Sequence, residues 1–370
     1  LIYKKNTENE SFTLKYLLDM GTNHDKRLKL AVDYLKFLGT DTMTPSEVQE
    51  EFYKLGCDLS VNCTNNQTNV TLSGLSNNFE ESVRLFENIL SNTIPNEEAL
   101  SDLKLSKLKS REDAKLNKQL ILWSAMYNYA KYGENSPFTN ILSEEELNTI
   151  SSTELMSLIH NLTSYHHRIL YYGPEDIHVI ADQLSNLHLN AFDLQEIKGG
   201  DSFIELNTDV PIVYVVDYDM KQAEILLFSK GKNLQINDIP IIKFHNEYFG
   251  SGMSSIVFQE MRESKALAYS VYSTYSIPKE KEKSHYSMSY IGTQSDKLTE
   301  ALDGMTALLN YMPEAFENME NAKEGIEQKI RTERITKSKI LSQYEKAQKM
   351  GVNHDLREDL YEDVQNFDMN

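Results

Sequence analysis

Residues 249–272 read F-G-S-G-M-S-S-I-V-F-Q-E-M-R-E-S-K-A-L-A-Y-S-V-Y, and this stretch is the most informative part of the chain. Gly250 and Gly252 flank a turn of small residues, which a helix-like segment (254–264) and a strand-like run (268–272) follow. Arg262 stands near the end of the predicted helix, and Tyr269 stands at the start of the predicted strand. We therefore expect both side chains to face one surface at the turn between these elements.

The same order of elements occurs twice in the chain. Residues 28–61 and 240–271 both predict an apolar helix, a turn of glycine and a small residue, a second helix and an apolar strand. Each copy continues into a second strand and then into an amphipathic helix (79–90 and 297–312), whose apolar residues recur at three- and four-residue intervals. An offset of about 210 residues indicates duplication of a whole domain rather than a short-period solenoid.

The two copies differ at their ends. The first copy closes with a long helical stretch (97–132) and a strand at 169–172. The second copy opens with a strand at 212–216, I-V-Y-V-V, and stops before any counterpart of the strand at 169–172. We therefore expect the second domain to be incomplete at its C-terminus and the chain to be a fragment of a longer polypeptide.

Strands grouped in hairpins, with separate long helices, predict the α+β class. We expect two tandem homologous domains, 1–190 and 210–370, each a mostly antiparallel sheet with helices packed on one face. The region 180–209 carries Gly199-Gly200 and mixed polar residues, which suit a linker, and we place that linker at 191–209.

Composition narrows the range of partners. Of the 370 residues, 40% are hydrophobic and 25% are charged, as in an ordinary soluble globular protein. A net charge of −19 argues against nucleic acid or an anionic membrane as a general partner, because both require a basic face. No apolar run approaches the roughly 20 residues that a membrane-spanning helix needs.

The 249–272 string resembles the zinc metallopeptidases of the insulinase/pitrilysin family, the inverzincins, which include the mitochondrial processing peptidases. The resemblance covers nearly the whole chain and is most specific at 244–292. It implies tandem α+β domains, two in each half of the molecule. It also implies that this string belongs to the half that carries no zinc, which faces the metal across a chamber and helps to hold the peptide.

Active members of that family carry H-x-x-E-H on the first helix of the first domain, just before a Gly-Thr turn. Alignment on Gly39-Thr40 shows that Leu30 and Tyr34 replace the two histidines. Asp33 is the only acid in the aligned motif, and its side chain is too short to be taken as equivalent to the glutamate. We therefore predict no metal site in this chain, and we expect zinc in the missing N-terminal half.

The resemblance assigns catalytic roles to Arg262 and Tyr269. A guanidinium and a phenol can donate hydrogen bonds to the oxyanion of a tetrahedral intermediate and to the substrate backbone. Gly250, Ser251 and Gly252 would contact the substrate, although the two glycines also have a simpler role in permitting a tight turn.

The residues alone leave other interpretations open. Arg262 can pair with Glu260 or Glu263 on the surface, and Tyr269 can simply pack against its neighbours. A third hypothesis is an independent metal enzyme that uses a histidine cluster containing His160 and His167.

The leading functional hypothesis is the C-terminal, non-metal-binding half of a zinc metalloendopeptidase. Its partner would be the N-terminal catalytic half of the same polypeptide, or a homologous catalytic subunit, and the two would close over a peptide substrate. This chain alone is then expected to be inactive. The alternative is a non-catalytic scaffold or partner subunit of the same family. Few cysteines and many Asn, Lys and Tyr residues favour a bacterial protein, and family relatives are often exported, so we expect a periplasmic location.

Overall fold

The computed structural model describes residues 1–188 and 193–369, which divide into two compact units. The first unit comprises Leu1–Ile204 with Lys337–Leu341, and the second comprises Glu205–Thr336 with Ser342–Asn370. Residues 189–190 of the predicted first domain, residues 191–192 of the predicted linker and the last residue lie outside the described part of the chain.

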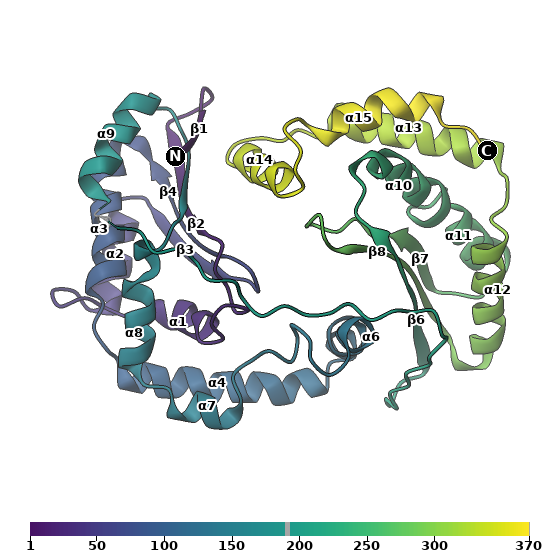
Figure 1. Ribbon diagram of the computed structural model, residues 1–370, viewed down its shortest axis with the longest axis horizontal. Coiled ribbons are helices and arrows are strands. Elements are labelled where there is room, and N and C mark those ends of the chain that lie inside the picture. Colours follow the sequence, from purple (N-terminus) through teal and green to yellow (C-terminus); the bar gives the residue numbers. More distant parts are fainter. Residues whose placement is uncertain (189–192, 370) are drawn as a thin grey trace. The chain divides into compact units, whose positions relative to one another are not determined.

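The first unit is built on a mixed sheet that, among the described residues, has five strands in the order β1-β5-β2-β4-β3 (Figure 1). The strand β1 (Ile2–Lys5) runs parallel to β5 (Arg168–Gly173). The strand β2 (Ser11–Leu18) runs antiparallel to both β5 and β4 (Thr68–Leu75), and β3 (Asp58–Cys63) pairs antiparallel with β4.

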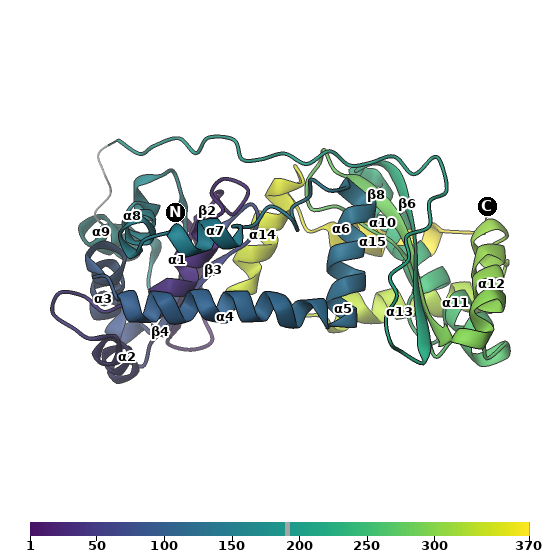
Figure 2. The same ribbon diagram turned by 90° about the horizontal axis from the view of Figure 1, so that it is seen from below.

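Helices cover one face of this sheet because apolar residues alternate along its strands. Phe12, Leu14 and Tyr16 of β2 are fully buried and pack in one cluster with apolar residues from the helices α1, α3, α8 and α9 (Figures 1 and 2). The described helices of this unit are α1 (Leu28–Leu35), α2 (Pro45–Lys54), α3 (Phe79–Asn92), α4 (Glu97–Lys115), α5 (Lys118–Leu120), α6 (Tyr127–Tyr132), α7 (Glu144–Thr149), α8 (Ser152–His160) and α9 (Ile177–Leu187).

The second unit has a smaller sheet, with three antiparallel strands in the order β6-β8-β7 in the described part of the chain. These strands are β6 (Gln222–Asn233), β7 (Ser270–Tyr275) and β8 (Ser284–Gln294). The remaining helices are α10 (Ile239–His245), α11 (Ile256–Phe258), α12 (Leu298–Asn310), α13 (Phe316–Thr332), α14 (Lys339–Lys349) and α15 (Leu356–Asp363). Turns of π-helix occupy Ile121–Met126, Asn246–Gly250 and Gln259–Ser264.

The two sheets share one arrangement. In the first unit β4 lies between β2 and β3, and in the second unit β8 lies between β6 and β7, with antiparallel pairing throughout. Each hairpin, β3-β4 or β7-β8, leads into an amphipathic helix, α3 or α12. The predicted α+β class is confirmed, whereas the homology of the two units stays a prediction.

Three expectations about local structure are wrong. Residues 212–216 form no strand, because a strand needs a hydrogen-bonded neighbour and no described strand pairs with this segment. The region from Ile180 onward begins in α9 rather than in a linker, since Asp176 caps that helix and its apolar residues face the core. The helical stretch 97–132 breaks after Lys115, where Asn117 caps a new turn by accepting hydrogen bonds from two backbone N–H groups.

Candidate functional site

Arg262 and Tyr269 lie side by side on the second unit. The Arg262 Cζ is 5.9 Å from the centre of the Tyr269 ring and 5.0 Å from the centre of the Phe258 ring. Both side chains reach solvent, and 75% of the surface of Tyr269 is exposed. The structure therefore brings these two predicted residues together, and leaves the guanidinium and the phenol open to a ligand.

A tight turn between the π-helical segment and β7 positions the pair. The backbone N–H groups of Leu267 and Ala268 both donate to the carbonyl oxygen of Met261, at 2.8 and 3.2 Å. Met261 is fully buried, so its side chain anchors the start of this turn in the core. Ala266 adopts a φ of 48°, in the left-handed region, which allows the chain to reverse within a few residues. Tyr269 then joins the sheet through its N–H, which donates to Gly292 O at 2.8 Å.

The backbone geometry of the predicted substrate loop requires glycine at two positions. A Cβ at Gly250 would lie 1.8 Å from the carbonyl oxygen of Ser273 in β7, so the backbone could not approach the strand this closely with any other residue. Gly252 has a φ of +88°, which a side chain would strain. Ser251 donates its N–H to Asn246 O at 2.7 Å and is half-buried. Contact of this loop with a substrate stays a prediction.

The surface ion pairs near Arg262 are loose. Its Nε lies 3.7 Å from a carboxylate oxygen of Glu263, and both side chains are about half exposed. Glu260 pairs instead with Lys265 at 3.2 Å. Exposed pairs of this kind contribute roughly 0–1 kcal/mol, so ion pairing does not fix the guanidinium in place.

The positions aligned with zinc-binding histidines belong to the core of the first unit. Leu30 is buried on α1, and Tyr34 is fully buried on the same helix. The Tyr34 hydroxyl donates to Asn96 O at 2.9 Å and accepts from Asn96 N at 2.8 Å. Leu30 therefore fills space in the core, and Tyr34 also holds the backbone of Asn96 at the start of α4. Zinc sites in proteins use Cys, His, Asp or Glu side chains, so neither residue replaces a histidine ligand.

Asp33 is held by two lysines. Its carboxylate accepts hydrogen bonds from Lys29 at 2.9 Å and Lys107 at 2.5 Å. Burial works to raise the pKa of Asp33, but the two ammonium groups outweigh it and the pKa is lowered. Within residues 1–188 and 193–369, no group of three or more His, Cys, Asp or Glu side chains is placed to hold a metal ion. The residues present do not fit zinc.

Comparison with known proteins finds a family whose model matches part of the chain. Residues 179–324 match the family described as the peptidase M16 inactive domain. This part of the chain is similar to the peptidase M16 inactive domain. The matched residues include the glycine loop, Arg262 and Tyr269, whereas the aligned positions on α1 lie outside them.

Individual proteins are similar to this chain over most of its length. The uncharacterized zinc protease YmxG of Bacillus subtilis is 24% identical over 340 residues, which span 88% of this chain and 79% of the relative. The crystal structure of a peptidase M16 inactive domain from Pseudomonas fluorescens has a TM-score of 0.74 at 18% identity, covering 99% of this chain and 89% of that one. The periplasmic protease PqqL from Escherichia coli has a TM-score of 0.72 at 12% identity, over 98% of this chain but 40% of its own. The two structural likenesses establish the fold.

His160 and His167 contact different partners and do not form one cluster. His160 Nε2 lies 2.9 Å from the Thr93 hydroxyl, whereas His167 Nε2 lies 2.9 Å from His188 Nε2. The second ring nitrogen of His188 lies 2.8 Å from a carboxylate oxygen of Glu87. The sequence does not predict this hydrogen-bonded series of Glu87, His188 and His167, because these residues are far apart along the polypeptide.

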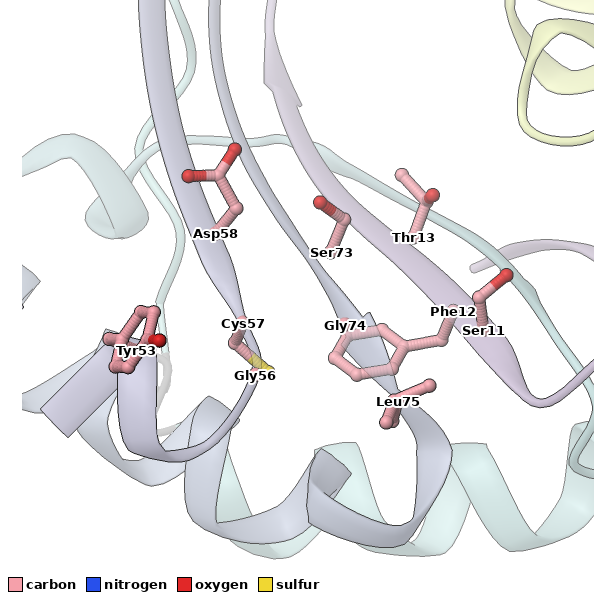
Figure 3. A pocket seen from close by; sticks show the side chains of 10 residues that line it. All are labelled: Ser11, Phe12, Thr13, Tyr53, Gly56, Cys57, Asp58, Ser73, Gly74 and Leu75. Atoms are coloured by element: carbon pink, nitrogen blue, oxygen red, sulfur yellow. The ribbon is translucent and has the colours of Figure 1, made fainter.

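A shallow hollow on the first unit lies at one end of β2, β3 and β4 (Figure 3). Asp58 is the single carboxylate among the described residues that line it, and Cys57 points instead toward Ser82, with 2.8 Å between the two side-chain heteroatoms. The hollow therefore assembles no acid–base pair. Its lining consists of Ser11, Phe12, Thr13, Tyr53, Gly56, Cys57, Asp58, Ser73, Gly74 and Leu75.

None of the described helices combines the length and the apolar character that crossing a bilayer requires.

Proposed function

We propose that this chain is the non-metal-binding half of a zinc metallopeptidase, which closes over a catalytic half and helps to hold a peptide between them. The observation that carries the proposal is the exposed pair of Arg262 and Tyr269, with the guanidinium 5.9 Å from the phenol ring. The pair lies in the segment that matches the M16 inactive domain, a domain type from a family that includes zinc proteases. The metal chemistry would belong to the other half.

The two side chains suit complementary tasks. The Arg262 guanidinium presents several N–H donors in a fixed plane, which can bind the carbonyl oxygens of an extended peptide. The Tyr269 hydroxyl can donate one hydrogen bond to the oxygen that gains negative charge when the peptide carbonyl is attacked. Because the ring lies beside the guanidinium, the positive charge also favours that developing oxyanion. Gly250, Ser251 and Gly252 would form the rim of the peptide site, on the same unit.

The test is peptide turnover by the chain combined with a catalytic half. A subunit with an intact H-x-x-E-H motif from the same source is mixed with this chain, and cleavage of a quenched fluorescent peptide is followed. The chain alone should give no turnover, and the mixture should give turnover. Tyr269→Phe keeps the ring beside the guanidinium and removes only the donor, so kcat should fall by about 10²–10³. Arg262→Ala should lower turnover by a similar factor and should also raise KM.

Matched controls separate this role from a general surface effect. Tyr311→Phe alters another exposed tyrosine, and Arg84→Ala removes an arginine whose ion pair with Glu80 is solvent-exposed. Both should leave turnover within about twofold of the unmodified mixture.

A specific observation also favours the scaffold alternative. The guanidinium of Arg262 lies closer to the Phe258 ring than to Tyr269, as it would if it only covered an aromatic surface. If the mixture cleaves peptide and neither Arg262→Ala nor Tyr269→Phe changes turnover, the pair is structural and the scaffold role is the better account.

A further inference from the structure

Phe258 is a partly exposed aromatic residue that follows two core residues. Ile256 and Val257 precede it in α11 and are buried in the core of the second unit. Phe258 itself is only partly buried, and among the described residues it is not one of the side chains that pack in that core. Its ring lies instead under the guanidinium of Arg262, with 5.0 Å between the ring centre and Cζ. The ring therefore serves the guanidinium rather than the core.

The backbone fixes the places from which the ring and the guanidinium project. The hydroxyl of the fully buried Ser255 donates to Gly252 O at 2.9 Å and accepts from Phe258 N at 3.4 Å, and it thereby caps α11. Four residues later, Arg262 follows the buried Met261. Side chains four residues apart on a helix are neighbours, so the fold itself places this ring beside this guanidinium.

The charged end of Arg262 is not held by a hydrogen-bonded ion pair. Its Nε lies 3.7 Å from the carboxylate of Glu263, which is beyond hydrogen-bonding range, and the two side chains are 45% and 54% exposed. A long side chain gives up rotamer entropy when it is held in one place, so some contact must oppose that loss. The rings of Phe258 and Tyr269, at 5.0 and 5.9 Å from Cζ, supply such a contact.

Glu263 competes with these rings for the guanidinium. A carboxylate can accept two parallel hydrogen bonds from a guanidinium, and those N–H groups would then not be available to a peptide carbonyl. Glu260 competes less, because its carboxylate pairs with Lys265 at 3.2 Å. The orientation of Arg262 is therefore decided between an aromatic surface on one side and the Glu263 carboxylate on the other.

We propose that Phe258 is a positioning residue, whose ring holds the Arg262 guanidinium over Tyr269 and away from Glu263. The N–H donors of Arg262 then stay available to a carbonyl oxygen of a bound peptide. Phe258 acts through Arg262, and the contact strengthens when a peptide excludes water from it. The effect on turnover rests on the proposed peptidase role, whereas the hold on Arg262 is a property of this chain alone.

The first measurement needs no catalytic half. The full 370-residue chain is prepared with isotope-labelled arginine, and the NMR signals of Arg262 are assigned by their loss in Arg262→Lys. Ring currents shift the side-chain protons of Arg262, so Phe258→Leu should move them toward the positions of a solvent-exposed arginine. Phe258→Tyr keeps a ring and should leave them nearly in place. Phe316→Leu alters a phenylalanine that is 69% exposed elsewhere on the second unit, and it should not move them.

The second measurement follows peptide cleavage by the chain combined with the catalytic half. Phe258→Leu should lower kcat/KM roughly 5- to 30-fold, mainly by raising KM, because a cation–ring contact contributes about that factor once water is partly excluded. Phe258→Tyr should keep kcat/KM within about threefold of the unmodified mixture, since it retains the ring. Phe316→Leu should leave it within about twofold.

The double variant Phe258→Leu with Glu263→Gln tests the competition directly. Without the carboxylate, the guanidinium is no longer drawn away, so the double variant should regain at least about threefold of the kcat/KM that Phe258→Leu loses. Glu263→Gln in the unmodified chain should change kcat/KM by less than about twofold, because the ring already holds the guanidinium. If the effects of the two substitutions simply add, the ring does not act against Glu263 and the proposal is overturned.

The two measurements distinguish failure of this proposal from failure of the peptidase role. Unchanged Arg262 signals in Phe258→Leu overturn the proposal, and so does unchanged kcat/KM in Phe258→Leu when Arg262→Ala lowers it. A mixture in which the unmodified chain gives no turnover refutes the proposed peptidase role instead. The arginine signals then decide by themselves whether Phe258 holds Arg262.

Discussion

Replacement of Gly250 with alanine tests how tightly the predicted substrate loop is held against β7. The added Cβ would lie 1.8 Å from Ser273 O, and real Cβ contacts stay beyond 3.0 Å, so the loop or the strand must move by at least about 1.2 Å. The obstructing atom belongs to the backbone of a paired strand, where the Ser273 hydroxyl also lies 2.8 Å from that of Ser289. We therefore expect Gly250→Ala to lower the free energy of unfolding of the second unit by about 3 kcal/mol, at the upper end of the range for overpacking.

The matched control is Gly252→Ala. A Cβ at this position would lie no closer than 3.9 Å to any other atom, so only the φ of +88° disfavours alanine. The free energy of unfolding should therefore fall by about 1 kcal/mol. Chemical unfolding with two probes distinguishes the units, because the single tryptophan, Trp123, lies in the first unit and circular dichroism reports both. With a slope of about 2 kcal/mol/M, Gly250→Ala should lower the urea midpoint of the second unit by about 1.5 M and leave the tryptophan transition unchanged. Equal midpoints for the two variants would show that the close approach to Ser273 does not constrain the loop.

Three further predictions concern acid stability, an ion pair and metal content. Burial lowers the pKa of His160, His167 and His245, so below about pH 6.5 the unfolded chain binds protons that the folded chain does not. The free energy of unfolding should therefore be highest above about pH 6.5 and fall as the pH drops below that value. A Tm that is constant from pH 7.5 to 5 would contradict this prediction. Lys107→Met removes one of the two lysines that hydrogen-bond to Asp33 and should destabilise the first unit by about 1 kcal/mol at pH 7. The destabilisation should shrink as the pH falls through the lowered pKa of Asp33 and the carboxylate takes up a proton, and urea unfolding at a series of pH values measures it. Treatment with a chelator should leave the Tm of this chain unchanged, and a drop accompanied by release of one zinc per chain would refute the assignment of the first helix as metal-free.

The sequence predicted the repeated part of the fold because periodicity and local turns determine it. The strands β3 and β7 and the helices α3 and α12 lie within the segments expected for them or within three residues of their ends, and β4 and β8 follow as the expected second strands. Their apolar residues recur with the period of a strand or a helix, and the hairpin partners are neighbours along the chain. Local information is sufficient where the pairing partner is close in sequence.

The prediction failed where structure depends on a distant or additional partner. Residues 212–216 have high strand propensity, but propensity does not supply the neighbour whose hydrogen bonds define a strand. Residues 180–187 have a composition that suits a linker, but they belong to α9, whereas the linker expected at 191–209 begins after that helix and stays a prediction. The π-helical turns at Asn246–Gly250 and Gln259–Ser264 have no sequence signature that we recognised.

In the candidate site, too, the sequence predicted contacts between residues that are close along the chain and missed contacts between distant ones. Arg262 and Tyr269 are close in sequence, so the spacing of helix, turn and strand was enough to place them together. The chain of hydrogen bonds through Glu87, His188 and His167 joins residues that are 101 and 21 positions apart, and no local pattern announces it. The hypothesis of a histidine cluster containing His160 and His167 fails for the same reason, because the two rings contact different partners.

The energetics of the two units separate residues that serve the fold from residues available for another role. Leu30 and Tyr34 are buried, and loss of the Tyr34 hydroxyl would leave the backbone of Asn96 without two hydrogen bonds, at a cost of about 1–3 kcal/mol. The exposed stack of Arg262 on Tyr269 contributes no more than about 0.5–1 kcal/mol, and exposed substitutions commonly change stability by less than about 0.5 kcal/mol. Substitutions at Leu30 and Tyr34 should therefore change the free energy of unfolding measurably, whereas substitutions at Arg262 and Tyr269 should hardly change it. A large effect of Tyr269→Phe on turnover, with an unchanged unfolding midpoint, would consequently assign the phenol to chemistry and not to folding.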